Sequence, residues 1–356
     1  MEVGLFSNGI RHRQTAADAY REDLHEVLVA DEAGFKQAWI AEHIGLHRPD
    51  TLPVPDLLIA KAAGLTKQIE LGVAVRLLPL YHPIDVATQA ATCDHLLEGR
   101  YLFGFGGGGP KSGMEQRGLD RGERHERMLE SFDLILKCWT TPEPFDYQGE
   151  FYSGQGIRVL PKPYQKPHMP IGVASATDSI VRMAAERGYM LMNSRYDTPD
   201  VLKRKAAKFE QASLAASQPA PRSRFIVCHQ VYVADSVAEA KADVRAGVDR
   251  DNVEDIAEFA DRHLKYYIPA GKTVEDVTFD DLVDQRWFIL GDPETVYQGI
   301  LRLHEEIGGF GTLLIVTGKD WTTREKNERS LRLFAEHVMP RLAALHPDAT
   351  ESKRVA

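Results

Sequence analysis

The sequence predicts an α/β fold, namely a (β/α)8 TIM-like barrel with insertions. Short β-rich runs alternate with longer helical patterns along the chain. Eight strand–helix repeats in this alternation favour a closed barrel over an open doubly wound sheet. The length of 356 residues suits one large barrel. We therefore expect a single domain over residues 1–345 and a frayed tail over residues 346–356.

The individual elements follow from their apolar patterns. Strands are predicted for the short β-rich runs at residues 3–6, 35–40, 69–77, 101–105, 171–174, 189–192, 225–233 and 312–316. The first helix is predicted from the 3.6-residue spacing of Tyr20, Leu24, Val27 and Leu28 within residues 15–33. Further helices are predicted at residues 57–64, 84–97, 121–139 and 323–344, and from near Asp178, Pro199 and Val237.

Two segments are longer than ordinary barrel connections. Residues 140–170 are rich in proline and aromatic residues, and residues 248–288 mix charge with Tyr266, Tyr267 and Ile268. Insertions of this length are usually functional lids or disordered excursions. We expect the second segment to act as a lid over the ligand site.

Composition narrows the function. There are 43 Lys and Arg against 52 Asp and Glu, a net charge of −9, which argues against nucleic acid and anionic membranes as partners. Cys93, Cys138 and Cys228 are widely spaced and are expected to be small core residues of a reducing cytoplasm. No apolar run approaches the roughly 18 residues that cross a bilayer. The cysteines and the lack of a long apolar run lead us to expect a cytoplasmic protein. The 13 histidines lack metal-ligand spacing, so we expect no metal site.

A charged pair, Glu42 and His43, follows the predicted strand at residues 35–40. Ligands of α/β folds bind at the carboxyl ends of strands, so both residues are candidates for catalysis. The alternative is equally open for this pair alone: the glutamate forms a salt bridge and the histidine caps a loop. Arg76 ends another apolar strand, and we expect it to face the barrel mouth or to pair with an acid such as Glu42.

A run of glycines follows the strand at residues 101–105. Residues 104–109 fit a dinucleotide fingerprint in spacing, but other residues intervene before the next helix, so we reject that interpretation. We expect a loop at Phe105, Gly106 and Gly107 that lets a planar or phosphorylated ligand lie against the backbone. The alternative is a flexible loop without a function.

Small and hydroxylated residues, Ser175, Ala176, Thr177 and Ser179, join a strand to a helix. Free N–H groups, hydroxyl donors and the positive end of the helix dipole together make an anion site. An ordinary helix cap is about as well supported by this segment. Asp178 would repel an anion unless its side chain turned away.

Taken together, the motifs resemble those of the bacterial luciferase-like flavin monooxygenases over nearly the whole chain. The similar runs are residues 41–43, 77–79 with 82–83, 97–101, 184–188 and 308–312. Several of them are similar to the terpenoid-oxidising branch, which comprises limonene and diketocamphane monooxygenases.

This resemblance implies a barrel that binds reduced FMN delivered by a separate NAD(P)H:flavin reductase, and a homodimer. It implies that His43 lies beside the flavin ring, that Ala74, Val75 and Arg76 line the cofactor with a non-prolyl cis peptide at residues 74–75, and that residues 177–179 hold the phosphate. Luciferases proper have an arginine for the phosphate at the position of Gly107, so Arg76, Arg100 or Lys111 would have to compensate.

The resemblance also implies the chemistry. Dioxygen would react with the reduced flavin while the barrel excludes water. His43 would handle the proton, and Glu42 would orient or charge the imidazole. A hydrophobic substrate, a terpenoid or ketone, would contact side chains of this set: Phe6, Trp39, Phe105, Met192, Tyr196 and Trp287. The alternatives are a deazaflavin-dependent oxidoreductase of the same fold and a non-catalytic flavin-binding protein.

Overall fold

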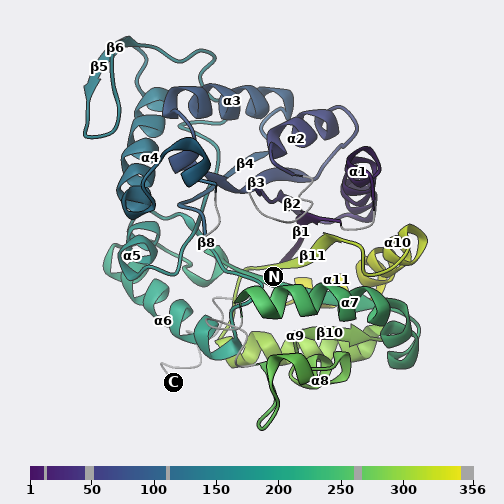
Figure 1. Ribbon diagram of the computed structural model, residues 1–356. Coiled ribbons are helices and arrows are strands. Elements are labelled where there is room, and N and C mark those ends of the chain that lie inside the picture. Colours follow the sequence, from purple (N-terminus) through teal and green to yellow (C-terminus); the bar gives the residue numbers. More distant parts are fainter. Residues whose placement is uncertain (12–13, 45–51, 110–112, 260–266, 346–356) are drawn as a thin grey trace.

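The predicted closed barrel is confirmed. The computed structural model describes residues 1–11, 14–44, 52–109, 113–259 and 267–345 (Figure 1). Its main sheet has nine parallel strands, and the pairing of β8 with β9 closes eight of them into a barrel. The barrel strands are β1 (Glu2–Ile10), β2 (Gln37–Ile40), β3 (Glu70–Leu77), β4 (Tyr101–Gly106), β7 (Ile171–Ala174), β8 (Met190–Met192), β9 (Phe225–Val233) and β11 (Thr312–Lys319). These are the eight runs that the sequence predicts as strands.

Helices surround the barrel and bury its outer face (Figure 1). They are α1 (Ala16–Ala33), α2 (Pro55–Ala63), α3 (Pro83–Leu96), α4 (Arg124–Thr140), α5 (Asp178–Glu186), α6 (Pro199–Ala215), α7 (Val237–Phe259), α8 (Phe279–Asp284), α9 (Pro293–Ile307), α10 (Arg324–Leu333) and α11 (Met339–Ala343). A π-helical stretch, Phe334–Val338, joins the last two. Among the described residues, no helix is both long and apolar enough to span a membrane. All three cysteines are buried, as predicted.

The two predicted insertions contain more regular structure than expected. Residues 140–170 include an antiparallel hairpin of β5 (Phe145–Gln148) and β6 (Ser153–Ile157), which stands beyond α3 and α4 (Figure 1). In the second segment, α7 continues to Phe259, and α8 and a ninth parallel strand, β10 (Phe288–Gly291), follow. Tyr266, Lys111 and the predicted tail lie outside the described residues.

The interior of the barrel is filled, and glycines make room for one large ring. A Cβ atom added to Gly72 would lie 2.7 Å from the Trp39 ring, and one on Gly104 or Gly172 would lie 3.1 or 3.4 Å from it. These glycines come from β3, β4 and β7, so the indole occupies space that side chains of three neighbouring strands would need. Trp39 is fully buried and donates its Nε1–H to Gln37. Side chains therefore close the barrel below its mouth.

An ionic cluster joins the first and last strands. Arg11, which is 3% exposed, pairs with Asp23 and Glu26 of α1, each at 2.9 Å. Glu26 also accepts the backbone N–H of Gly318 on β11 at 2.9 Å. Burial lowers the pKa of Arg11, but Glu26 and Asp23 raise it more, so the guanidinium stays charged. The seam between β1 and β11 is thus held by charges that are shielded from water.

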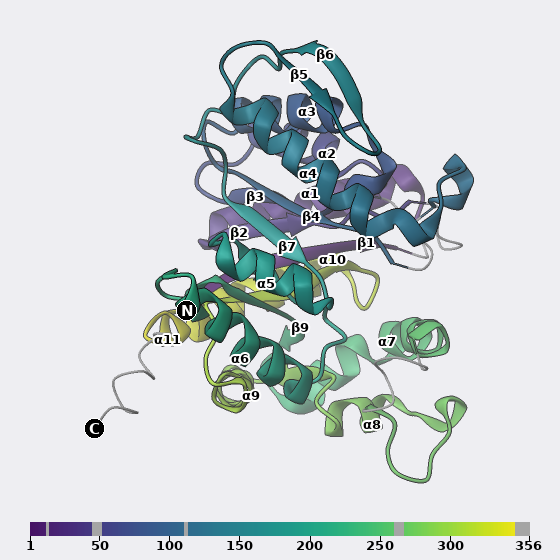
Figure 2. The same cartoon turned by 90° about the vertical axis from the view of Figure 1, so that its left-hand side faces the viewer.

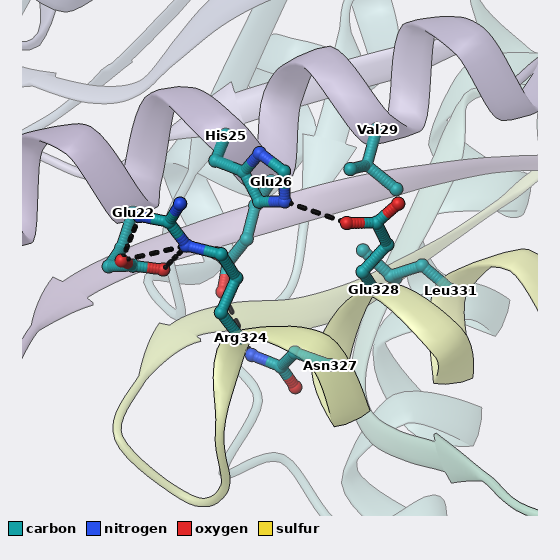
Figure 3. A pocket seen from close by; sticks show the side chains of 8 residues that line it. All are labelled: Glu22, His25, Glu26, Val29, Arg324, Asn327, Glu328 and Leu331. Carbon is teal, nitrogen blue, oxygen red and sulfur yellow. Dashed lines mark hydrogen bonds and ion pairs between the residues drawn. The ribbon is translucent and has the colours of Figure 1, made fainter.

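A small pocket adjoins this cluster at Glu26, between α1 and α10 (Figure 3). Its charged side chains contact each other across the two helices: Glu22 with Arg324, and His25 with Glu328 at 2.9 Å. The pocket therefore belongs to the packing of these helices.

Candidate functional site

The predicted site residues follow strands that run in the same direction, so they gather at one end of the barrel. Parallel pairing aligns the carboxyl ends of β2, β3, β4 and β7. Figure 2 shows the N-terminus on the opposite side of the barrel from α7 and α8. This carboxyl-end face is where barrel proteins bind their ligands.

Glu42 lies two residues after the end of β2 and is 3% exposed. One carboxylate oxygen pairs with Arg76 at 2.8 Å, and the other accepts the hydroxyl of Tyr81 at 2.8 Å. Burial raises the pKa of Glu42, while Arg76 and Tyr81 oppose that rise without cancelling it. The pairing of Arg76 with Glu42 is the one that the sequence predicts.

Arg76 also reaches a second carboxylate, that of Asp56 in the first turn of α2. Asp56 accepts the hydroxyl of Tyr101 on β4 at 2.7 Å. Arg76 is 2% exposed, Asp56 7% and Tyr101 1%. The sequence alone did not identify Asp56, Tyr81 or Tyr101 as part of this site. The one feature that could have pointed to them is Arg76, because an arginine in an apolar strand needs a buried partner.

His43 follows Glu42 and is half-buried. Its backbone N–H donates to the carbonyl of Leu52 at 3.2 Å, which ties the main chain just after β2 to the residues just before α2. The imidazole is thus attached to an anchored segment at the edge of the site. Its proton-handling role, and the action of Glu42 upon it, stay predictions.

The ends of β3, β4 and β7 form a floor of small side chains. The peptide bond between Ala74 and Val75 is cis, as the resemblance implied. A Cβ atom added to Gly106 would lie 2.8 Å from a methyl group of Val75 and 3.3 Å from the carbonyl oxygen of Ala174. Because residue 106 is a glycine, the three strand ends can approach one another. The floor they form carries only the side chains of alanine and valine.

Phe105 does not share this floor. Its ring is fully buried and stacks on Phe132 of α4, with the ring centroids 4.0 Å apart. Successive side chains of a strand point to opposite faces, so Phe105 faces the helix layer while Gly104 and Gly106 face the barrel. The prediction that the side chain of Phe105 lines the substrate pocket is wrong. Only its backbone can adjoin a ligand.

The predicted anion segment forms the start of α5. Ala176, Thr177 and Ser179 are exposed, Ser175 is half-buried, and the backbone N–H of Thr177 donates to the Ser175 hydroxyl at 3.0 Å. Within the described chain, the Thr177 side chain makes no capping hydrogen bond. Asp178 turns to Lys208 of α6, at 2.7 Å, so its charge is paired away from the segment. The N–H of Ile180 already donates to the carbonyl of Thr177, so the two N–H groups ahead of it in α5 are the ones available for an acceptor.

Gly107 adjoins the start of a second helix. A Cβ atom at this position would lie 3.7 Å from the backbone oxygen of Arg124 and 3.9 Å from its Cγ. Arg124 is half-buried and begins α4. The sequence offered one indication of this contact, namely an arginine near the start of the predicted helix at residues 121–139. Lys111 falls among the undescribed residues.

Apolar and aromatic side chains occupy the rest of this end of the barrel. Tyr196 and Trp287 lie with their ring centroids 5.6 Å apart, and Tyr267 meets Trp287 edge-on at 4.6 Å. One hydrophobic cluster includes them together with Phe6, Trp39 and Met192. Five of the six predicted pocket side chains thus fall in a single cluster, and Phe105 is the exception.

Polar side chains gathered at the carboxyl end of a closed parallel barrel are characteristic of a barrel enzyme. The chain belongs to the luciferase-like monooxygenase family, whose model matches residues 1–309. It is therefore an oxidoreductase, a flavin-dependent monooxygenase of the luciferase-like type. The resemblance noted in the sequence is confirmed.

Two similar proteins are informative about chemistry. The chain is 31% identical over 329 residues to 4-hydroxyprotoasukamycin monooxygenase of Streptomyces nodosus subsp. asukaensis, covering 90% of this chain and 86% of that one. It is 28% identical to the oxygenating constituent of 3,6-diketocamphane monooxygenase of Pseudomonas putida, a type II Baeyer-Villiger monooxygenase whose structure was solved in complex with FMN. That structure matches with a TM-score of 0.84 over 96% of this chain and 98% of the other.

A third structure shares the fold alone. It is an F420-dependent secondary alcohol dehydrogenase in complex with an F420–acetone adduct, 17% identical, with a TM-score of 0.73 over 95% of this chain and 98% of that one. The same barrel thus accommodates a deazaflavin in another protein.

Proposed function

We propose that this protein is an FMN-dependent monooxygenase that uses reduced FMN from a separate reductase, together with dioxygen, to oxygenate a hydrophobic small molecule. The observation that carries the proposal is the close approach of Gly106 to Val75 and Ala174 beside the open start of α5. A floor without large side chains suits a flat ring system, and free helix N–H groups suit a phosphate.

The residues present fit FMN. The ring system would be held against Ala74, Val75 and Gly106, and the phosphate by the segment of Ser175, Ala176, Thr177 and Ser179. The backbone oxygen and Cγ of Arg124 adjoin Gly107, the position at which luciferases proper have their arginine, and we assign the compensating positive charge to this side chain. When bound in its reduced form, FMN supplies the electrons with which dioxygen is activated.

The protein's own side chains supply the remaining requirements. We assign proton transfer to the imidazole of His43, since this side chain gains and loses a proton near neutral pH. Arg76 and Tyr81 hold the carboxylate of Glu42 in a fixed position, and Glu42 is the residue directly before His43 in the chain. The aromatic cluster of Tyr196, Tyr267 and Trp287 excludes water from this end of the barrel.

The proposed substrate is hydrophobic because the side chains available to contact it are apolar. Phe6 and Met192 belong to the same cluster as the aromatic side chains, and the fully buried Trp39 fills the barrel below them. Two similar proteins are a diketocamphane and an asukamycin-type monooxygenase, which supports a terpenoid or ketone class for this chain.

Oxygen consumption tests the proposal. The purified protein is supplied with reduced FMN and a panel of cyclic ketones and terpenes. It should consume dioxygen and form an oxygenated product, with at most one molecule of product for each molecule of reduced FMN consumed. The control replaces FMN with reduced F420. Reduction of a ketone of the panel to its alcohol with F420 alone would favour the deazaflavin enzyme, and flavin binding without any turnover would favour a non-catalytic flavin-binding protein.

Thr177→Ala should weaken FMN binding by about 1–2 kcal/mol, the contribution of one charge-assisted hydrogen bond. Riboflavin, which lacks the phosphate, should bind this variant almost as well as it binds the wild type. Flavin fluorescence quenching measures both dissociation constants. Equal weakening for the two flavins would place the phosphate elsewhere.

A further inference from the structure

Five side chains, Glu42, Asp56, Arg76, Tyr81 and Tyr101, form one connected polar network. Arg76 lies between the carboxylates of Glu42 and Asp56, and each carboxylate also accepts a tyrosine hydroxyl at 2.7–2.8 Å. The guanidinium further lies 4.9 Å from the centre of the Tyr81 ring. The one guanidinium thus pairs with two carboxylates. Removing either carboxylate therefore changes the net charge that is buried in the network.

The network connects the elements that carry the proposed site. Glu42 precedes His43 on the segment after β2, and Arg76 directly follows the cis peptide of Ala74 and Val75 on β3. Asp56 comes from α2, and the backbone of Leu52, just before that helix, accepts the N–H of His43 at 3.2 Å. The start of α2 therefore anchors both the histidine segment and the end of β3.

We propose that Asp56 is a positioning residue for the flavin site, which acts through Arg76 on Glu42 and on the end of β3. The inference rests on the proposed function, because it takes the floor of Ala74 and Val75 as the place of the flavin ring. Asp56 lies in α2 and reaches the floor through Arg76. Its carboxylate fixes the guanidinium, and the guanidinium fixes both the strand end and the carboxylate beside His43.

Asp56→Asn tests this step because asparagine keeps the size of the side chain and removes its charge. We expect the dissociation constants of FMN and of riboflavin to rise together, by about tenfold, which corresponds to about 1.4 kcal/mol. The two flavins should respond alike because the floor holds the ring that they share. This pattern differs from that of Thr177→Ala, which should affect FMN alone.

The matched control is Asp31→Asn. Asp31 is also a poorly exposed carboxylate, and it accepts the backbone N–H groups of Lys67, Gln68 and Ile69 at 2.8–2.9 Å, before the amino end of β3. Its loss should lower the melting temperature and leave both dissociation constants unchanged. A merely structural role for Asp56 would give the same result as this control.

A double-mutant cycle with Glu42→Gln examines the route through Arg76. If both carboxylates act through the same guanidinium, the combined variant should lose less affinity than the sum of the two single losses. Strict additivity would overturn the inference, and so would a folded Asp56→Asn protein with wild-type affinity for both flavins.

Tyr101→Phe keeps the inference testable if Asp56→Asn fails to fold. This variant removes only the hydroxyl that donates to Asp56. It should weaken both flavins about threefold, and unchanged constants would overturn the inference. Wild-type protein that binds neither flavin would contradict the proposed function itself, so the two failures are distinguishable.

Discussion

His43→Ala should reduce turnover by about 10²- to 10⁴-fold, the usual contribution of a positioned acid–base group. The side chain lies at the edge of the site on a segment whose main chain is anchored to Leu52. Removing a half-buried imidazole leaves that anchor in place, so the fold and the affinity for FMN should persist. The measurements are the turnover number with reduced FMN, the melting temperature and the FMN dissociation constant.

His82→Ala is the matched control for that experiment. His82 is exposed near the same end of the barrel, where its Nδ1 accepts the N–H of Ile84 at the start of α3. We expect its loss to leave turnover near the wild-type value. If His43→Ala lowered stability and activity in proportion, the histidine would be structural.

Arg11→Ala should lower the free energy of unfolding by about 3–5 kcal/mol. The guanidinium pairs with Asp23 and Glu26, which are 0% and 5% exposed, and its removal takes one cation away from two buried carboxylates. Water cannot compensate charges that it does not reach. Denaturant-induced unfolding, followed by far-UV circular dichroism, measures the loss.

Arg324→Ala provides the comparison on the same seam. Arg324 pairs with Glu22 across α1 and α10, but its side chain is 43% exposed (Figure 3). Exposed pairs contribute about 0–1 kcal/mol, so this variant should stay close to the wild type. Similar losses for both arginines would contradict the view that the buried cluster holds the ends of the barrel together.

The barrel strands were predictable because each is a short apolar run between turn residues. One further strand, Phe288 to Gly291, is not among the predicted ones, since the predicted insertion ends at residue 288 and residues 289–291 are assigned to no element. Helix α9 was also missed, although Val296, Ile300, Leu303 and Ile307 recur at helical spacing and are all buried. In both places the apolar pattern of the element is present in the sequence. It was overlooked because both elements follow the long segment at residues 248–288, which has no clear pattern of its own.

The site was predictable where one residue demanded a partner. An arginine within an apolar strand requires an acid, and Glu42 was the expected one. Asp56 meets Arg76 only because α2 packs beside β3, a contact without a local sequence pattern. The error at Phe105 has a different origin. Every residue of β4 is buried, so its composition does not reveal which side chains face the barrel.

The glycines around Trp39 have an optical consequence. An indole held without exposure to water, directly below the proposed flavin floor, should emit at short wavelength and transfer its excitation to a flavin above it. Replacing Trp139, Trp287 and Trp321 with phenylalanine would leave Trp39 as the single emitter. Such a protein would report the arrival and departure of flavin in real time, without any attached dye.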